Sequence, residues 1–236
     1  MKRTLVALAA AMLGAGAWAG AVSNTTNDVT LRLTGFAYGS ASADLTLDSN
    51  GVIGVGELKG EITRNGVTTS FLTYCTDIYQ SVGFNTTYTY TQVANGASPG
   101  FSTGQADLLG KLYTLAGRDV DTTDESVAFQ LAVWEIVNES NSGLNVQSGL
   151  FKLVAGAGSV SNAQITLANN WLTAVSDVNA VKSFNAERLY SSVTQDFVVF
   201  TQVPNVSIQN VPEPASFGLV GLALLGLWGT RQARRR

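Results

Sequence analysis

The chain has 236 residues, a single cysteine, Cys75, and no histidine. These counts exclude zinc sites built from Cys and His, catalysis by Ser-His or Cys-His pairs, and any intramolecular disulfide. Between Gly20 and Pro214 lie eight of the fourteen basic residues and all seventeen acidic ones, which gives this part a net charge of about −9. Because such a surface repels phosphate backbones, nucleic acid is not expected as a partner.

The N-terminus has the pattern of a signal peptide. Lys2 and Arg3 precede an apolar run over residues 5–13, and residues 17–19 have the small-x-small sequence that signal peptidase accepts. Residues 1–19 are therefore predicted to be cut off before Gly20, and the chain is predicted to be exported. The body that follows, residues 20–203, is long enough for one domain with a sizeable core.

The first half of the body is predicted to form antiparallel sheet. Apolar and polar residues alternate around Val29, Leu31 and Leu33, and again around Leu45 and Leu47. Asn-Gly dipeptides, which are typical of hairpin turns, occur at residues 50–51, 65–66 and 95–96.

The middle of the body is predicted to be helical. A first helix starts at Thr103, carries leucines at helical spacing and ends near Gly117. A second helix covers the apolar run 127–137, because Thr122 and Glu125 before it fit a capping box.

A third helix is predicted over residues 162–175, and the chain returns to strand over 193–203. Residues 204–211 are predicted to be a polar linker. The predicted fold class is α+β: an antiparallel sheet or sandwich with a small inserted helical subdomain.

The C-terminal tail, residues 212–236, begins with Pro212, Glu213 and Pro214 and continues with an uncharged stretch, 215–230. As a helix this stretch would reach about 24 Å, a little short of the hydrocarbon core of a bilayer. It predicts a single transmembrane sorting helix that holds the precursor in the inner membrane transiently, with the terminal arginines in the cytoplasm. These arginines are Arg231, Arg234, Arg235 and Arg236.

The order of these three parts resembles the PEP-CTERM sorting signal of Gram-negative bacteria. The resemblance implies that an exosortase recognises and removes the tail, and that the body reaches the periplasm, the outer surface or the extracellular matrix. An ordinary C-terminal anchor is the alternative.

The second predicted helix contains an unusual polar residue. Only Gln130 and Glu135 are polar between residues 127 and 137, and a helix that is apolar on nearly all sides should be buried. A buried amide without partners costs about 1 to 3 kcal/mol, so Gln130 needs hydrogen bonds or a covalent bond. The thiol of Cys75 could attack the Gln130 side-chain carbonyl, expel ammonia and leave an internal thioester.

The sequence around both residues resembles the thioester domains of bacterial surface adhesins. Tyr74 and Cys75 are followed by Asp77, and the run from Gln130 to Trp134 follows 55 positions after the cysteine, at the start of a helix. The resemblance implies that Cys75 supplies the thiol and Gln130 the acyl group.

It also implies that Ala132 permits close approach and that Trp134 packs over the bond. Such a bond captures an amine or hydroxyl of the matrix or of a neighbouring cell. Phe129 departs from the family pattern, in which threonine often precedes the glutamine.

Other interpretations remain open. Cys75 could be a small buried apolar residue and Gln130 a partner of strand backbone, in a non-covalent structural protein of the envelope or biofilm matrix. Asp77 and Glu135 could be solvated, or could orient the cysteine and an incoming amine. A secreted hydrolase acting on polysaccharide is less favoured, because no pair of carboxylates stands out. The chain is thus expected to be no enzyme and to need no cofactor or metal.

Overall fold

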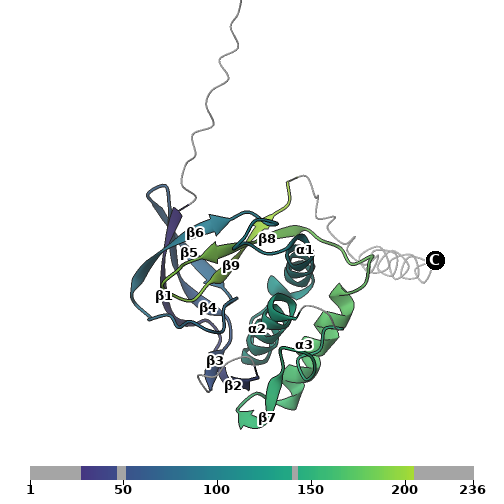
Figure 1. Cartoon of the computed structure of the whole chain (residues 1–236). Coiled ribbons are helices and arrows are strands. Elements are labelled where there is room, and N and C mark those ends of the chain that lie inside the picture. Colours follow the sequence, from purple (N-terminus) through teal and green to yellow (C-terminus); the bar gives the residue numbers. More distant parts are fainter. Residues whose placement is uncertain (1–27, 47–51, 140–142, 205–236) are drawn as a thin grey trace, which may run out of the picture.

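The computed structural model describes residues 28–46, 52–139 and 143–204 (Figure 1). The predicted signal peptide, nearly all of the predicted linker and the tail with its predicted transmembrane helix lie outside these ranges. Within them, no helix is both long enough and apolar enough to cross a bilayer.

Six antiparallel strands form the larger sheet, in the order β5-β4-β1-β6-β8-β9. The buried positions of β1 include Val29, Leu31 and Leu33, which confirms the predicted alternation. Asn65 and Gly66 form the turn between β4 and β5, both with positive φ, as a type I′ hairpin turn requires. The strands are β1 (Asp28–Phe36), β4 (Leu58–Arg64), β5 (Val67–Thr73), β6 (Thr87–Val93), β8 (Phe184–Tyr190) and β9 (Phe197–Gln202).

This sheet curls until its two outer strands meet. Thr73, at the end of β5, donates from Oγ1 to the Val198 carbonyl at 2.7 Å. The Val198 N–H donates to the Tyr74 carbonyl at 3.1 Å, and Cys75 forms an isolated bridge with Phe197. Cys75 therefore lies where β5 and β9 join.

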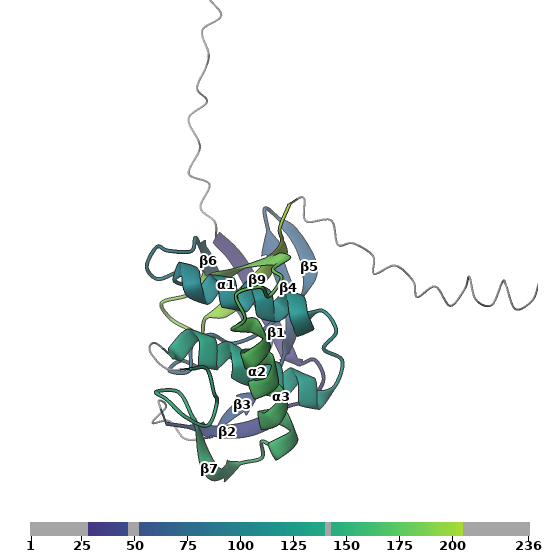
Figure 2. The same cartoon turned by 90° about the vertical axis from the view of Figure 1, so that its right-hand side faces the viewer.

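A smaller sheet has the order β3-β2-β7 and lies at one end of the helices (Figures 1 and 2). Its strands are β2 (Ala41–Leu45), β3 (Ile53–Val55) and β7 (Leu153–Gly158). The strand predicted around Leu45 is confirmed up to that residue, whereas Leu47 and the turn predicted at 50–51 lie outside the described residues. No pattern in the sequence had indicated β7.

Three helices are inserted between β6 and β8. They are α1 (Thr103–Leu112), which continues into a π-helical turn, η1 (Tyr113–Gly117), then α2 (Thr123–Asn138) and α3 (Asn162–Val175). Each α-helix begins with a complete capping box; the one at Thr122 and Glu125 was predicted, and the predicted helix starts at residues 103 and 162 are confirmed. The α+β class and the helical insertion are therefore confirmed.

One predicted hairpin is wrong. Asn95 and Gly96 do form a turn, with Gly96 at positive φ, but the chain then enters α1 instead of a second strand. The Gly96 N–H donates to the Phe101 carbonyl at 2.7 Å, which directs the chain to Ser102, the N-cap of α1. The strand that pairs with β6 on this side is β8, far along the chain.

Candidate functional site

Cys75 and Gln130 are in direct contact, although 55 positions separate them in the sequence. The Cys75 N–H donates to Gln130 Oε1 at 2.8 Å, and Gln130 Nε2 donates to the Cys75 carbonyl at 2.9 Å. Gln130 is fully buried and Cys75 is 6% exposed. One amide side chain thus satisfies both backbone groups of Cys75, as a neighbouring strand would.

α2 places Gln130 at this position. Every residue from 126 to 136 is buried, as expected of a helix with few polar positions. Gln130 lies in the middle of α2, so the prediction that Gln130 stands at the start of a helix is wrong. The helix begins about two turns earlier, because the capping box of Thr122 and Glu125 sets its first residue. The helix therefore passes the Cys75 segment with its centre rather than its end.

The Cys75 thiol lies in an environment that disfavours ionisation. Burial raises its pKa well above the usual range, and the negative charge of Asp77 raises it further. The thiol is therefore protonated at neutral pH, unlike the exposed low-pKa thiolates of redox and protease sites.

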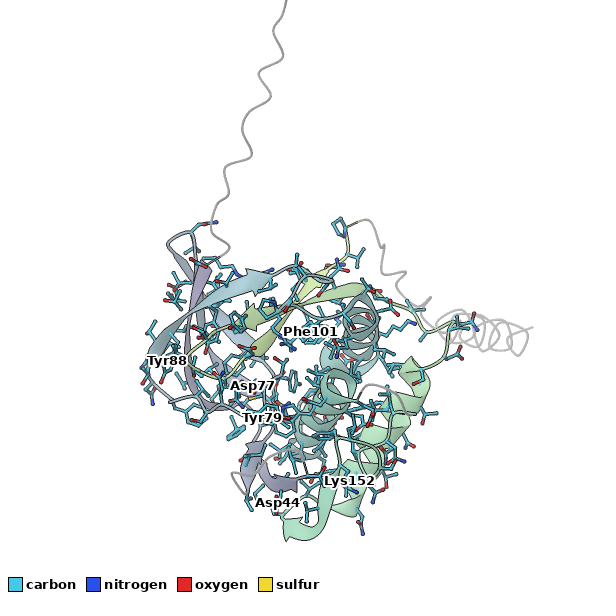
Figure 3. The ribbon with its side chains drawn as sticks, viewed as in Figure 1. Asp44, Asp77, Tyr79, Tyr88, Phe101 and Lys152 are labelled. Carbon is cyan, nitrogen blue, oxygen red and sulfur yellow. The ribbon has the colours of Figure 1, made fainter. Side chains whose placement is uncertain are left out.

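Asp77 lies in the loop that follows Cys75, between the larger sheet and the helices (Figure 3). Its Oδ1 accepts the Tyr79 N–H at 2.7 Å, and its carbonyl accepts Gln195 Nε2 at 2.9 Å. The carboxylate is half-buried. Asp77 thus shapes its own loop and affects Cys75 through its charge.

Tyr74 and Phe129 form the aromatic contact beside the cysteine. Their ring centroids are 4.4 Å apart and both residues are buried. This packing gives a physical reason for an aromatic residue at position 129. The Tyr74 hydroxyl lies beside Glu57, whose pKa burial raises to about 7 while the hydroxyl contact lowers it in part.

The remaining residues of the motif lie on α2. Ala132 and Trp134 are fully buried, and the Trp134 ring lies 6.4 Å from that of Phe151. Glu135 is also fully buried, so the solvated alternative is wrong for this residue. Its Oε1 accepts the Asn145 N–H at 2.7 Å, which ties the chain after α2 to the helix.

The pKa of Glu135 is raised to about 7, first by burial and then by the charge of Glu139. Within the described ranges, no cluster of three or more metal-ligating side chains could hold a metal ion. Glu57 and Gln195 were not predicted, because no local sequence pattern distinguishes them. Only the tertiary structure brings Glu57 to Tyr74 and Gln195 to Asp77.

Comparison with known proteins identifies the tail. The family model described as the PEP-CTERM protein-sorting motif matches residues 210–236. No curated protein and no solved structure matches the chain. The protein is therefore an exported protein that carries a PEP-CTERM sorting motif, with exosortase as its processing partner, and the match extends over the tail alone.

Proposed function

We propose that the body is a covalent attachment module, in which Cys75 Sγ and Gln130 Cδ form an internal thioester. After the exosortase has removed the tail, the thioester ties the protein to an amine or hydroxyl on the extracellular matrix or on a neighbouring cell. The hydrogen bonds between the Gln130 amide and both backbone groups of Cys75 are the observation that carries this proposal.

The two hydrogen bonds suit the chemistry of bond formation. The Cys75 N–H points at the carbonyl oxygen of Gln130, where negative charge develops when sulfur attacks the carbon, so it acts as an oxyanion donor. The Cys75 carbonyl holds the nitrogen that must leave. Rotation about the Cα–Cβ bond moves the sulfur among its staggered positions without any change in the backbone.

The reaction balances without a cofactor. The Sγ–Cδ bond forms, the bond between Cδ and Nε2 breaks, and the thiol proton leaves with the nitrogen as ammonia. A target amine then attacks Cδ, forms an amide with the Gln130 acyl group and returns the thiol to Cys75. Burial protects the thioester from water between the two steps.

Intact mass spectrometry of the purified protein tests the proposal. The wild type should be lighter by one ammonia than its processed sequence, and methylamine should add in full to Gln130, leave the protein one methylene heavier than that sequence and release one free thiol. Cys75→Ala and Gln130→Glu are matched controls that should show neither change. Full sequence mass of the wild type, with one Cys75 thiol that alkylating reagents modify once the protein is unfolded, would overturn the proposal.

A second candidate is a non-covalent structural protein of the envelope or biofilm matrix. It is favoured by one observation: both polar groups of the Gln130 side chain already have hydrogen-bond partners without a covalent bond. The same mass measurement separates the two functions, because this candidate requires an intact Gln130 amide.

A further inference from the structure

An apolar patch, formed by Leu115, Val178 and Val181, lies where η1 meets the end of α3. Leu115 is 48% exposed, Val178 87% and Val181 68%. Leu115 and Val181 line one open pocket of about 350 Å³, together with Val175 and Ala180. Val178 stands in the loop between these last two residues. Large apolar side chains that gather on a surface in this way mark an interaction site.

The last described residues of the chain lie beside this patch, because β9 ends next to the start of β8 (Figure 1). The Val203 N–H donates to the Ser183 carbonyl at 2.9 Å. The Ser183 N–H in turn donates to Oγ1 of Thr114 at 2.8 Å, and Thr114 lines the same pocket. These hydrogen bonds fix the point from which the chain leaves the body next to the patch.

The tail limits how far this point can move from the membrane in the precursor. Eleven residues, 204–214, separate Val203 from the uncharged stretch 215–230. Even fully extended they reach at most about 36 to 40 Å. The uncharged stretch is itself short for a bilayer, which draws the residues before it toward the headgroups. The side of the body around Val203 therefore faces the lipid.

Charged groups around the patch balance one another. The Nζ atoms of Lys111 and Lys182 lie 3.0 and 3.4 Å from the carboxylate oxygens of Asp107. Asp177, in the loop after α3, brings these four side chains to no net charge. The body as a whole carries about −9, which a bilayer with anionic lipids repels. An apolar surface without net charge is the part of the body that approaches such a bilayer at the least cost.

We propose that the apolar patch is the membrane-contact surface of the precursor. Leu115, Val178 and Val181 enter the interfacial layer of the bilayer and hold the body in one orientation until the exosortase removes the tail. The contact is intramolecular as long as the tail is attached, so the tether provides a high effective concentration of lipid. The inference does not depend on the thioester.

Quenching by spin-labelled lipid tests this orientation. The full chain carries Cys75→Ala and one new cysteine labelled with a fluorophore, at Val181→Cys in the patch or at Val193→Cys as the matched control. Val193 is 79% exposed and lies just beyond β8, the strand that begins close to Val181. Since β8 has seven residues, the control position is about 20 Å further along the body.

The vesicles contain phosphatidylcholine with a nitroxide near the top of one acyl chain. Groups in the interfacial layer lie about 5 to 10 Å deep, so the label at 181 should lose at least about half of its fluorescence and the label at 193 less than about a tenth. Leu115→Ser combined with Val178→Ser should lower the quenching at 181 at least about twofold. Val52→Ser, at a residue that is 56% exposed and does not line the pocket, should leave it unchanged.

Equal quenching at positions 181 and 193 would overturn the inference, because the body would then have no preferred face. A label at 181 that stays unquenched would also overturn it. Energy transfer between labels at 181 on separate copies would then assign the patch to a second copy of the chain. If Val206→Ser combined with Ile208→Ser instead opens the label to an aqueous quencher, the patch belongs to the segment before the tail.

Discussion

Replacing Gln130 with glutamate tests the pairing between α2 and the Cys75 segment most directly. The two side chains have the same shape, but a carboxylate cannot donate to the Cys75 carbonyl as Nε2 does at 2.9 Å. A protonated carboxyl can donate, so the substitution should be nearly neutral in acid and costly in base. Both proteins should carry Cys75→Ala, so that no thioester contributes to the comparison.

The size of the effect follows from the burial of the site. Gln130 is fully buried, and a fully buried carboxyl has its pKa raised by up to about 3 to 5 units above the unfolded value near 4.3. Each unit is worth about 1.4 kcal/mol, but the retained Cys75 N–H offsets part of the shift, so we expect a loss of about 2 to 4 kcal/mol at pH 8.

The sign of the pH dependence is fixed. Because the new carboxyl has a raised pKa in the folded state, the substitution costs little below about pH 4 and progressively more as pH rises. Urea unfolding of both proteins at about pH 4 and pH 8 gives the difference in free energy of unfolding, and background titrations cancel in the comparison. A difference that stays the same at both pH values would show that residue 130 is not held against Cys75 as described.

Three further predictions concern other parts of the molecule. Burial raises the pKa of Glu57 and of Glu135 to about 7, so the free energy of unfolding should be highest near pH 4.5 and fall as pH rises to 7. Glu57→Gln should reduce this pH dependence and raise the free energy of unfolding at pH 8 by up to about 3 kcal/mol, as measured by urea unfolding. Gly110→Ala should lower the free energy of unfolding by about 2 kcal/mol or more, because the new Cβ would lie 2.2 Å from the Phe184 carbonyl oxygen. The melting temperature should fall with it, and an unchanged thermal transition would contradict the packing of α1 on β8. Glu213→Ala should leave an uncleaved precursor in the inner membrane, detected by immunoblot of fractions with an epitope placed after the motif, and normal release would count against exosortase recognition of this motif.

Much of the local structure was determined by the sequence. The capping boxes, the bounds of α3 and the turn at Asn65 and Gly66 all depend on hydrogen bonds between residues three or four positions apart, or on backbone conformations that few residue types adopt. The sorting motif is also contiguous, and the match over residues 210–236 confirms it. Burial of α2 followed from its composition, because a helix without a polar face has no other stable place.

Only the tertiary structure decided how these elements meet. The Asn95-Gly96 turn has a clear local signal, but which strand pairs with β6 depends on β8, about a hundred residues away. The sequence left open whether Glu135 is solvated, and only the fold shows that it is buried and accepts the Asn145 N–H. The contact between Gln130 and Cys75 requires α2 to pass the segment where β5 and β9 join, which is a matter of long-range register that no short segment encodes.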